Sequence, residues 1–152
     1  MLIYLDSSIL TRAYLPDEPG HQEAAELVYG YEHLLVSATW TVVEVTSALT
    51  RAAKGRRADG PGDLLAVLAE DTGDDGTVTL VRADAVQVED RVTAVVREHA
   101  IRSLDALHLA VAGLAARPLT EPLGFAARDD AQGTVASALG FVPWPFPGPA
   151  QG

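Results

Sequence analysis

The chain has 152 residues and no cysteine, and its formal net charge is −10. This length fits one globular domain, and a composition of 48% hydrophobic and 21% charged residues is that of a folded protein. The lack of cysteine excludes disulfides, thiolate zinc sites and a cysteine nucleophile, so any metal must be bound by oxygen or imidazole. The negative charge argues against a protein that coats nucleic acid, since such proteins are normally basic.

Strands and helices are expected to alternate along the chain. In chain order they are a strand at 2–5, a helix at 21–31, a strand at 34–37, helices at 39–54 and 61–71, a strand at 78–81, helices at 85–99 and 103–116, a strand at 122–126, a helix at 129–139 and a strand at 141–142. This alternation predicts a three-layer α/β/α domain over residues 1–142, with a central, mostly parallel sheet of four to five strands. The proline-rich residues 143–152 are expected to form an extended or disordered tail.

No apolar run is long enough to cross a membrane, and residues 1–6 have a strand pattern without the features of a signal peptide. We therefore expect a cytoplasmic protein without membrane contact.

Four acidic positions lie near junctions between predicted strands and helices. Asp6 ends the first strand, Glu44 lies in an apolar helical segment, Asp105 lies in the first turn of another helix with Ser103 as its expected cap, and Asp129 follows the fourth strand. Each has an ordinary explanation as well, because Asp6, Asp105 and Asp129 suit helix starts and Glu44 suits an exposed helix face.

The combination of these acids is more informative than any single one. A parallel sheet brings the carboxyl ends of its strands to one edge, where the side chains would gather. Clustered carboxylates repel one another unless a cation neutralises them, and oxygen-only ligands favour magnesium or manganese over zinc. Such a site can bind a phosphodiester and activate water, which predicts hydrolytic phosphodiester cleavage.

Three segments that carry these acids resemble the signature segments of PIN domains. They are Leu5-Asp6-Ser7-Ser8-Ile9-Leu10, Val43-Glu44-Val45-Thr46-Ser47-Ala48-Leu49 and Ser103-Leu104-Asp105-Ala106-Leu107-His108-Leu109-Ala110. Their order and spacing match, and the resemblance covers residues 1–142. The size of the chain is similar to that of VapC toxins, which are ribonucleases of bacterial toxin–antitoxin modules.

The resemblance implies roles for individual residues. Asp6 and Asp105 would be Mg²⁺ ligands, with Mn²⁺ as a substitute, and Glu44 would complete the acidic set. Ser8 would support the site and Ser103 would orient Asp105. The fourth acid would be Asp129, but the family often has Thr or Ser two residues before that position and this chain has Ala127, so Asp130 remains an alternative.

The VapC resemblance also implies partners. They are an RNA substrate, of which transfer RNA or another structured RNA is our expectation, a cognate VapB-type antitoxin that blocks the acidic groove, and a second copy of the chain in a homodimer. The sequence does not define the RNA that is cut.

Basic residues gather at one place, where Arg51, Lys54, Arg56 and Arg57 follow the Glu44 helix. They either complement the dipole at the end of that helix or contact RNA phosphates. His108 lies three positions after Asp105, and packing or hydrogen bonding is its expected role, so we assign it no part in catalysis.

Two other functions are open at this point. A strand-end aspartate also occurs in aspartate-dependent phosphatases and phosphoacceptor domains, but those need a lysine near the phosphoryl group, and Lys54 lies at a helix end. A catalytically silent PIN-fold module that only binds a partner is the second alternative.

Overall fold

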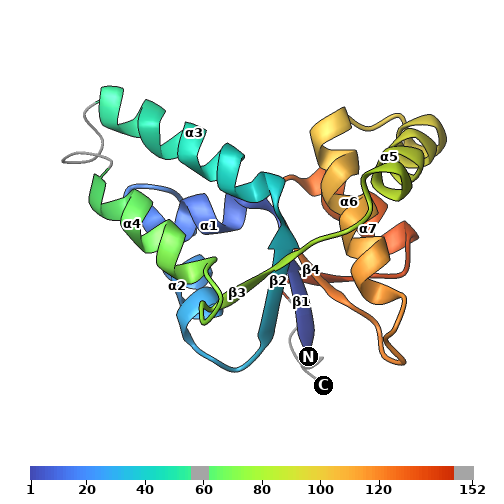
Figure 1. Ribbon diagram of the computed structural model, residues 1–152, viewed down its shortest axis with the longest axis horizontal. Helices are drawn as coiled ribbons and strands as arrows, with labels where there is room; N and C mark the ends of the chain where they lie inside the picture. The colour runs from blue at the N-terminus through green and yellow to red at the C-terminus, as the bar shows by residue number, and fades with distance from the viewer. Residues whose placement is uncertain (56–61, 146–152) are drawn as a thin grey trace, which may run out of the picture.

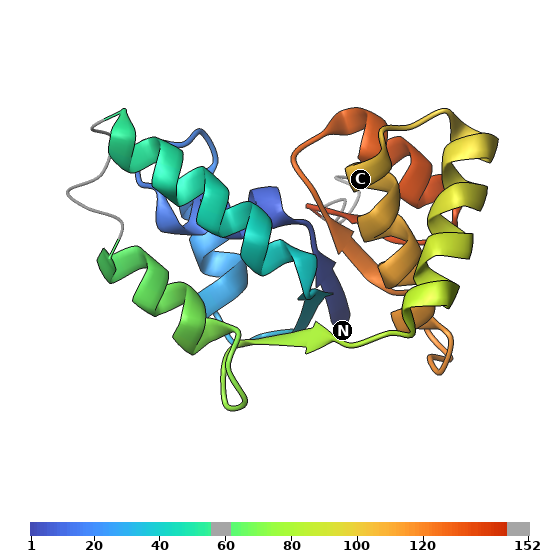
Figure 2. The same ribbon diagram turned by 45° about the horizontal axis from the view of Figure 1, so that its top comes forward.

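The computed structural model describes residues 1–55 and 62–145. In chain order its elements are β1 (Leu2–Leu5), α1 (Ser7–Tyr14), α2 (His21–Tyr29), β2 (Leu34–Ala38), α3 (Trp40–Lys54), α4 (Gly62–Asp71), β3 (Val78–Val81), α5 (Ala85–His99), α6 (Ser103–Ala116), β4 (Gly124–Ala126), α7 (Asp130–Ala138) and β5 (Val142–Trp144). Helices α1–α4 lie on one side of the sheet and α5–α7 on the other (Figures 1 and 2). The expected three-layer α/β/α fold is confirmed.

The sheet has five strands in the order β3-β2-β1-β4-β5, and every neighbouring pair is parallel. The chain moves outward from β1 through β2 to β3, and then returns to add β4 and β5 on the other side of β1. The direction of progression therefore reverses between β1 and β4. In open parallel sheets such a reversal leaves a crevice at the carboxyl ends of the two strands, where ligands bind.

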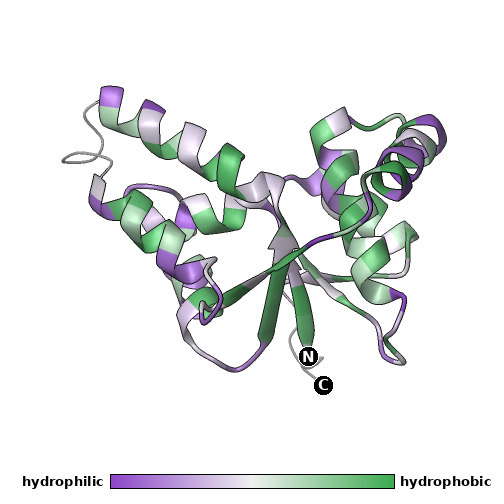
Figure 3. Cartoon of the chain, in the orientation of Figure 1, coloured by the Kyte–Doolittle hydropathy of each residue, from purple (hydrophilic) through white to green (hydrophobic). Residues whose placement is uncertain are grey.

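Each face of the sheet has its own hydrophobic core. Ile3 and Leu5 of β1 pack against α1–α4, whereas Tyr4 faces the core formed with α5–α7. All three side chains are fully buried. A strand covered on both faces has no polar alternation, which is why β1 is a continuous apolar run (Figure 3).

Helix α1 was not expected from the sequence. It begins directly after β1, with Asp6 as its N-cap, and buries Ile9, Leu10, Ala13 and Tyr14. The Asp6 side chain accepts the Ser8 backbone N–H, as an N-cap does. The helix has only eight residues. Its brevity and its start without a loop concealed its periodicity.

Strand β5 extends through Pro143 and Trp144, so the expected tail begins later than its proline content indicates. β5 lies at the edge of the sheet beside β4. Proline is tolerated there because an edge strand needs hydrogen bonds on one side only. Residues 146–152 of the expected tail lie outside the described residues.

Asp71 at the end of α4 ties three helices together. One oxygen, Oδ2, accepts hydrogen bonds from the Tyr14 hydroxyl of α1 at 2.8 Å and from the Tyr29 hydroxyl of α2 at 2.7 Å. Burial, followed by the hydrogen bond to Asp71, raises the pKa of both tyrosines. The buried carboxylate thus replaces its hydration with two phenol donors.

Among the helices at 1–55 and 62–145, none is long and apolar enough to cross a membrane.

Replacing Asp71 with alanine should lower the free energy of unfolding by about 2 kcal/mol, because it leaves the buried Tyr14 hydroxyl and the partly buried Tyr29 hydroxyl without their charged acceptor. Urea denaturation measures the loss. Glu70→Ala, one residue earlier on the exposed face of α4, is the matched control and should change stability little. Equal stabilities of the two variants would contradict the bracing role of Asp71.

Candidate functional site

Asp6 lies at the carboxyl end of β1, in the crevice between β1 and β4. Its backbone N–H bonds to the Ala126 carbonyl at the end of β4, at 2.9 Å. Asp6 is only 7% exposed, and both oxygens of its carboxylate accept hydrogen bonds. Oδ2 accepts the Ser8 hydroxyl at 2.6 Å, and Oδ1 accepts the Gln132 amide at 3.3 Å. The charged group therefore has a fixed orientation.

Glu44 points inward from α3 and does not lie on an exposed helix face. Its Oε1 is 2.6 Å from His108 Nε2, and its Oε2 accepts the Ser7 hydroxyl at 3.2 Å. The same His108 nitrogen lies 3.5 Å from Asp6 Oδ1. The imidazole thus links the carboxylates of α3 and β1.

His108 is packed and hydrogen-bonded, as expected, but its contacts place it in the site. It is 1% exposed, and Nδ1 lies 2.8 Å from the Tyr4 hydroxyl. That hydroxyl can either donate to a neutral ring or accept from a charged one. Burial alone would lower the pKa of His108, but the hydrogen bond to Glu44 and the charges of Asp6, Glu44 and Asp105 outweigh it, so the pKa is raised.

Asp105 and Asp129 are joined by Arg102. The Arg102 Nε lies 2.8 Å from Asp105 Oδ2, and its terminal Nη2 lies 3.4 Å from Asp129 Oδ2. Asp129 is also the N-cap of α7, since its Oδ1 accepts the Gln132 backbone N–H at 2.9 Å. The capping role and the role in the acidic cluster therefore coexist, one on each carboxylate oxygen.

Asp130, the alternative fourth acid, is the first residue of α7. Its side chain is exposed and, within the described part of the chain, forms no ion pair with Arg102. The geometry thus associates Asp129, rather than Asp130, with Asp105.

Ser8 and Ser103 differ in what they contact. Ser8 donates its hydroxyl to Asp6. Ser103 was expected to cap α6 and to orient Asp105, but the N-cap is Arg102 and Ser103 is exposed. No hydrogen bond joins Ser103 to Asp105 within the described residues, and the group that holds Asp105 is the Arg102 guanidinium.

A cavity of about 440 Å³ brings these side chains together, and we call it the acidic cavity. Its lining residues are Asp6, Ser8, Arg102, Asp105, Arg128, Asp129, Asp130 and Gln132. Gln132 spans it, donating to Asp6 Oδ1 and to the Asp105 backbone carbonyl, both at 3.3 Å. Glu44 lies outside this cavity and lines its neighbour.

The donor chemistry fits a hard divalent cation, because Asp6, Asp105 and Asp129 offer carboxylate oxygens to one cavity. The present arrangement holds these oxygens in other contacts: over residues 1–55 and 62–145, no three acidic or imidazole groups converge as ligands of one ion. Arg102 supplies the cationic charge between Asp105 and Asp129, and its side chain is 77% exposed. A cation that binds there has to displace a flexible, solvent-facing group.

The predicted basic cluster is only partly within the described residues. Arg51 lines the cavity next to the acidic one, beside Glu44, whereas Lys54 ends α3. Arg56 and Arg57 lie outside the described residues.

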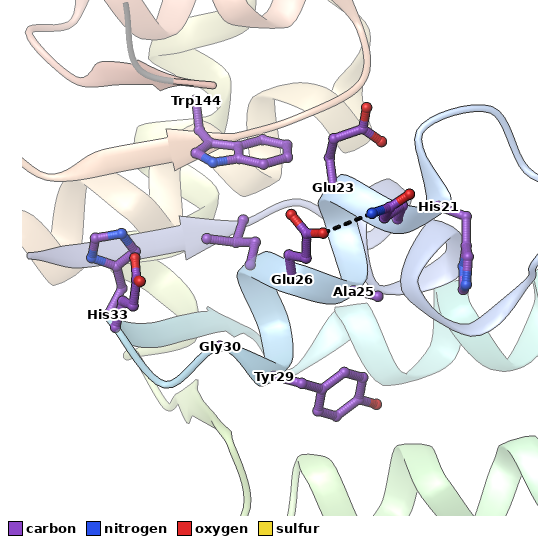
Figure 4. A pocket seen from close by; sticks show the side chains of 11 residues that line it. His21, Glu23, Ala25, Glu26, Tyr29, Gly30, His33 and Trp144 are labelled. Atoms are coloured by element: carbon purple, nitrogen blue, oxygen red, sulfur yellow. Dashed lines mark hydrogen bonds between the residues drawn. The ribbon is translucent and has the colours of Figure 1, made fainter. Parts of the chain in front are cut away.

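A larger cavity of about 950 Å³ lies apart from the acidic cavity, between α2 and Trp144 (Figure 4). The described residues that line it include Glu23, Glu26 and Glu32 but no arginine or lysine. This charge is unfavourable for an anionic ligand, so size does not identify the functional site in this molecule.

The molecule is a three-layer α/β/α domain with a parallel sheet, and its aspartates lie where the strand order reverses. The family comparison names the member: the PIN domain model matches residues 3–120, and the chain belongs to the PIN domain family. PIN domains are usually nucleases and typically use divalent metal ions. The match includes Asp6, Glu44 and Asp105 and ends before Asp129. A search of curated proteins found no match.

Replacing Glu44 with glutamine should destabilise the protein more at about pH 6 than at about pH 9, both measured in a chelator. The pKa of His108 is raised in the folded state. Its pairing with Glu44 therefore stabilises the protein fully below the pKa of the unfolded state, about 6.5. This stabilisation disappears as the pH rises through the pKa of the folded state. Urea denaturation of both proteins at both pH values gives the difference. A gap that stays constant or widens with rising pH would contradict this assignment.

Proposed function

We propose that the protein is a magnesium-dependent endoribonuclease of the VapC toxin type. The observation that carries this proposal is that carboxylates from three distant segments, Asp6, Asp105 and Asp129, face one cavity at the reversal of strand order. In this proposal Asp6 and Asp105 hold Mg²⁺, with Mn²⁺ as a substitute, and Glu44 and Asp129 complete the acidic set. A bound ion of this kind supplies an electrophile for the phosphodiester and lowers the pKa of a bound water.

The residues around the acids supply orientation and charge. Ser8 and Gln132 fix the two oxygens of Asp6, and Gln132 also holds the backbone of Asp105. His108 keeps a proton between Glu44 and Asp6, which reduces the repulsion between these two carboxylates. When RNA enters, the exposed Arg102 guanidinium is free to exchange an aspartate for a phosphate oxygen.

The partners in this proposal follow the toxin type. They are an RNA substrate such as transfer RNA, a VapB-type antitoxin that covers the acidic cavity, and a second copy of the chain in a homodimer. RNA contacts at Arg51, Lys54, Arg56 and Arg57 belong to the same proposal.

The alternatives receive less support from the site. A phosphoacceptor or phosphatase mechanism needs a lysine beside Asp6, and Lys54, the only lysine, lines neither cavity around the acids. A silent binding module would have no need for carboxylates from three distant segments that face one cavity.

Asp6→Asn and Asp129→Asn should each reduce RNA cleavage at least about a hundredfold, because each removes a carboxylate charge at the reacting phosphate. Asparagine is as good an N-cap as aspartate, so α1 and α7 should keep their starts. Cleavage is measured by mapping new ends in total RNA incubated with Mg²⁺ and antitoxin-free protein.

Asp130→Asn is the matched control for this test, since it removes the same charge from the next residue and should leave cleavage nearly unchanged. Wild-type protein that folds and binds Mg²⁺ but produces no new RNA ends would favour the silent module. Equal loss in the variants of Asp129 and Asp130 would contradict the role of Asp129.

Arg102→Gln should tighten the binding of Mn²⁺ several-fold, because it removes the guanidinium that competes for Asp105 and Asp129. Calorimetric titration without RNA measures this effect separately from activity. The control is Arg97→Gln, which makes the same change in net charge on the exposed face of α5. Unchanged or weaker Mn²⁺ binding in the Arg102 variant would show that Arg102 does not compete with the ion.

A further inference from the structure

Tyr4 carries a buried hydroxyl to which the proposed function assigns no role. The residue lies in the middle of β1 and is fully buried. Its ring packs in the core formed with α5–α7 and stacks on Phe125 of β4, with 5.4 Å between the ring centroids. A phenylalanine ring would make the same contacts, so packing explains the ring of Tyr4 but not its hydroxyl.

The hydroxyl of Tyr4 meets the imidazole of His108, which lies in α6. Its oxygen is 2.8 Å from His108 Nδ1. The two residues are 0% and 1% exposed, so neither can replace the other with bulk water. Burial and then the negative charge of Asp6 raise the pKa of Tyr4 well above its ordinary value, so the hydroxyl keeps its proton. This buried hydrogen bond connects the central strand to α6.

The other nitrogen of His108, Nε2, has to carry a proton. It lies 2.6 Å from Glu44 Oε1, and an ionised carboxylate can only accept a hydrogen bond. When the ring is neutral, Nδ1 has a lone pair and the Tyr4 hydroxyl donates to it. When the ring is charged, Nδ1 carries a second proton and the hydroxyl oxygen accepts it. Tyr4 therefore satisfies Nδ1 in both states, and its contact does not depend on the charge of the ring.

Tyr4 also determines which edge of the imidazole faces the acids. A histidine ring that makes half a turn about the bond to its Cβ exchanges its nitrogen positions for carbon positions. In the turned ring, carbon atoms would face both Tyr4 and Glu44, and both hydrogen bonds would be lost. The observed orientation directs Nε2 at Glu44 and places it 3.5 Å from Asp6 Oδ1.

The carboxylate of Glu44 depends on this orientation. It extends from α3, and its one other hydrogen bond within the described residues is a longer one, from the Ser7 hydroxyl to Oε2 at 3.2 Å. The short bond to His108 is the contact that directs Glu44 toward Asp6. Two hydrogen bonds in series, from Tyr4 to His108 and from His108 to Glu44, thus connect the core of the sheet with the acids.

We propose that Tyr4 is a positioning residue of the site, which acts through His108 to fix the carboxylate of Glu44 relative to that of Asp6. This inference rests on the proposed nuclease function, in which Glu44 completes the acidic set. It assigns the buried hydroxyl of β1 to the site, although the ring belongs to the hydrophobic core.

Nuclear magnetic resonance of the metal-free protein in EDTA, without RNA and at neutral pH, tests the contact directly. In wild-type protein the His108 Nε2 proton should give a resolved signal, because a buried, hydrogen-bonded proton exchanges slowly with water. The spectrum of His108→Gln identifies this signal among those of the four histidines. Tyr4→Phe should broaden or abolish the signal, because the ring loses the bond that holds its orientation.

Cleavage kinetics test the consequence for the site. The substrate is an oligoribonucleotide that contains the cleavage position mapped in total RNA. Tyr4→Phe should lower kcat about tenfold or more and leave KM nearly unchanged, because a misplaced carboxylate acts on the reacting phosphate. In a His108→Gln background, the same substitution should have no further effect on kcat, since Tyr4 acts only through the imidazole.

Tyr14→Phe is the matched control. It removes the same hydroxyl from another buried tyrosine, whose partner is Asp71. This variant should lose stability but keep the wild-type kcat and the wild-type His108 signal. An equal loss of kcat in the two tyrosine variants would show that kcat follows stability, which would overturn the proposal.

Three further results would overturn the positioning role of Tyr4. They are an unchanged His108 signal in Tyr4→Phe, a wild-type kcat in that variant, and a loss of kcat that is equally large with and without His108. The nuclease function fails in a different way. Wild-type protein that cleaves no RNA, together with a His108 signal that Tyr4→Phe abolishes, would contradict the nuclease function and leave the contact between Tyr4, His108 and Glu44 in place.

Discussion

The site depends on one constraint, which is that the carboxylate at the end of the central strand is buried and must be compensated. Asp6 lies where β1 and β4 diverge, and it is almost removed from solvent. A charge in this position is unfavourable unless hydrogen bonds and opposite charges replace its hydration. Ser8, Gln132 and His108 provide these contacts from α1, α7 and α6. Three helices are thereby fixed around one strand end.

The two basic side chains of the site, His108 and Arg102, differ in how easily they can be displaced. His108 is enclosed between Tyr4 and the carboxylates of Glu44 and Asp6 and is almost completely buried. Arg102 reaches Asp105 and Asp129 from the surface and has water as an alternative. Exposed ion pairs contribute little to stability, so displacing Arg102 costs little. The buried contacts of His108 fix the positions of Glu44 and Asp6. The exposed contacts of Arg102 leave Asp105 and Asp129 open to an exchangeable cation.

Much of the fold followed from the sequence because the central strands are apolar runs and the long helices have clear periodicity. The sequence does not reveal helix α1, since the helix is short and starts without a loop. Pro143 conceals the end of β5, because proline is excluded from central strands but tolerated in an edge strand. For the site, position at strand ends identified Asp6 and Asp129 as candidates. Arg102 and Gln132 could not be found in this way, because a single arginine or glutamine has no characteristic spacing. Their roles arise from tertiary contacts between α6 and α7.

The pairing of β1 with β4 also determines when the site can exist. Asp6 precedes Gln132, which orients both Asp6 and Asp105, by 126 positions in the chain and is therefore synthesised well before it. Contacts between segments this far apart in sequence form late, after the loop between them has closed. A nascent chain on the ribosome therefore has the first acid but not the completed cavity. The acidic cavity is completed only after α7 has been synthesised and Gln132 has reached Asp6 and Asp105.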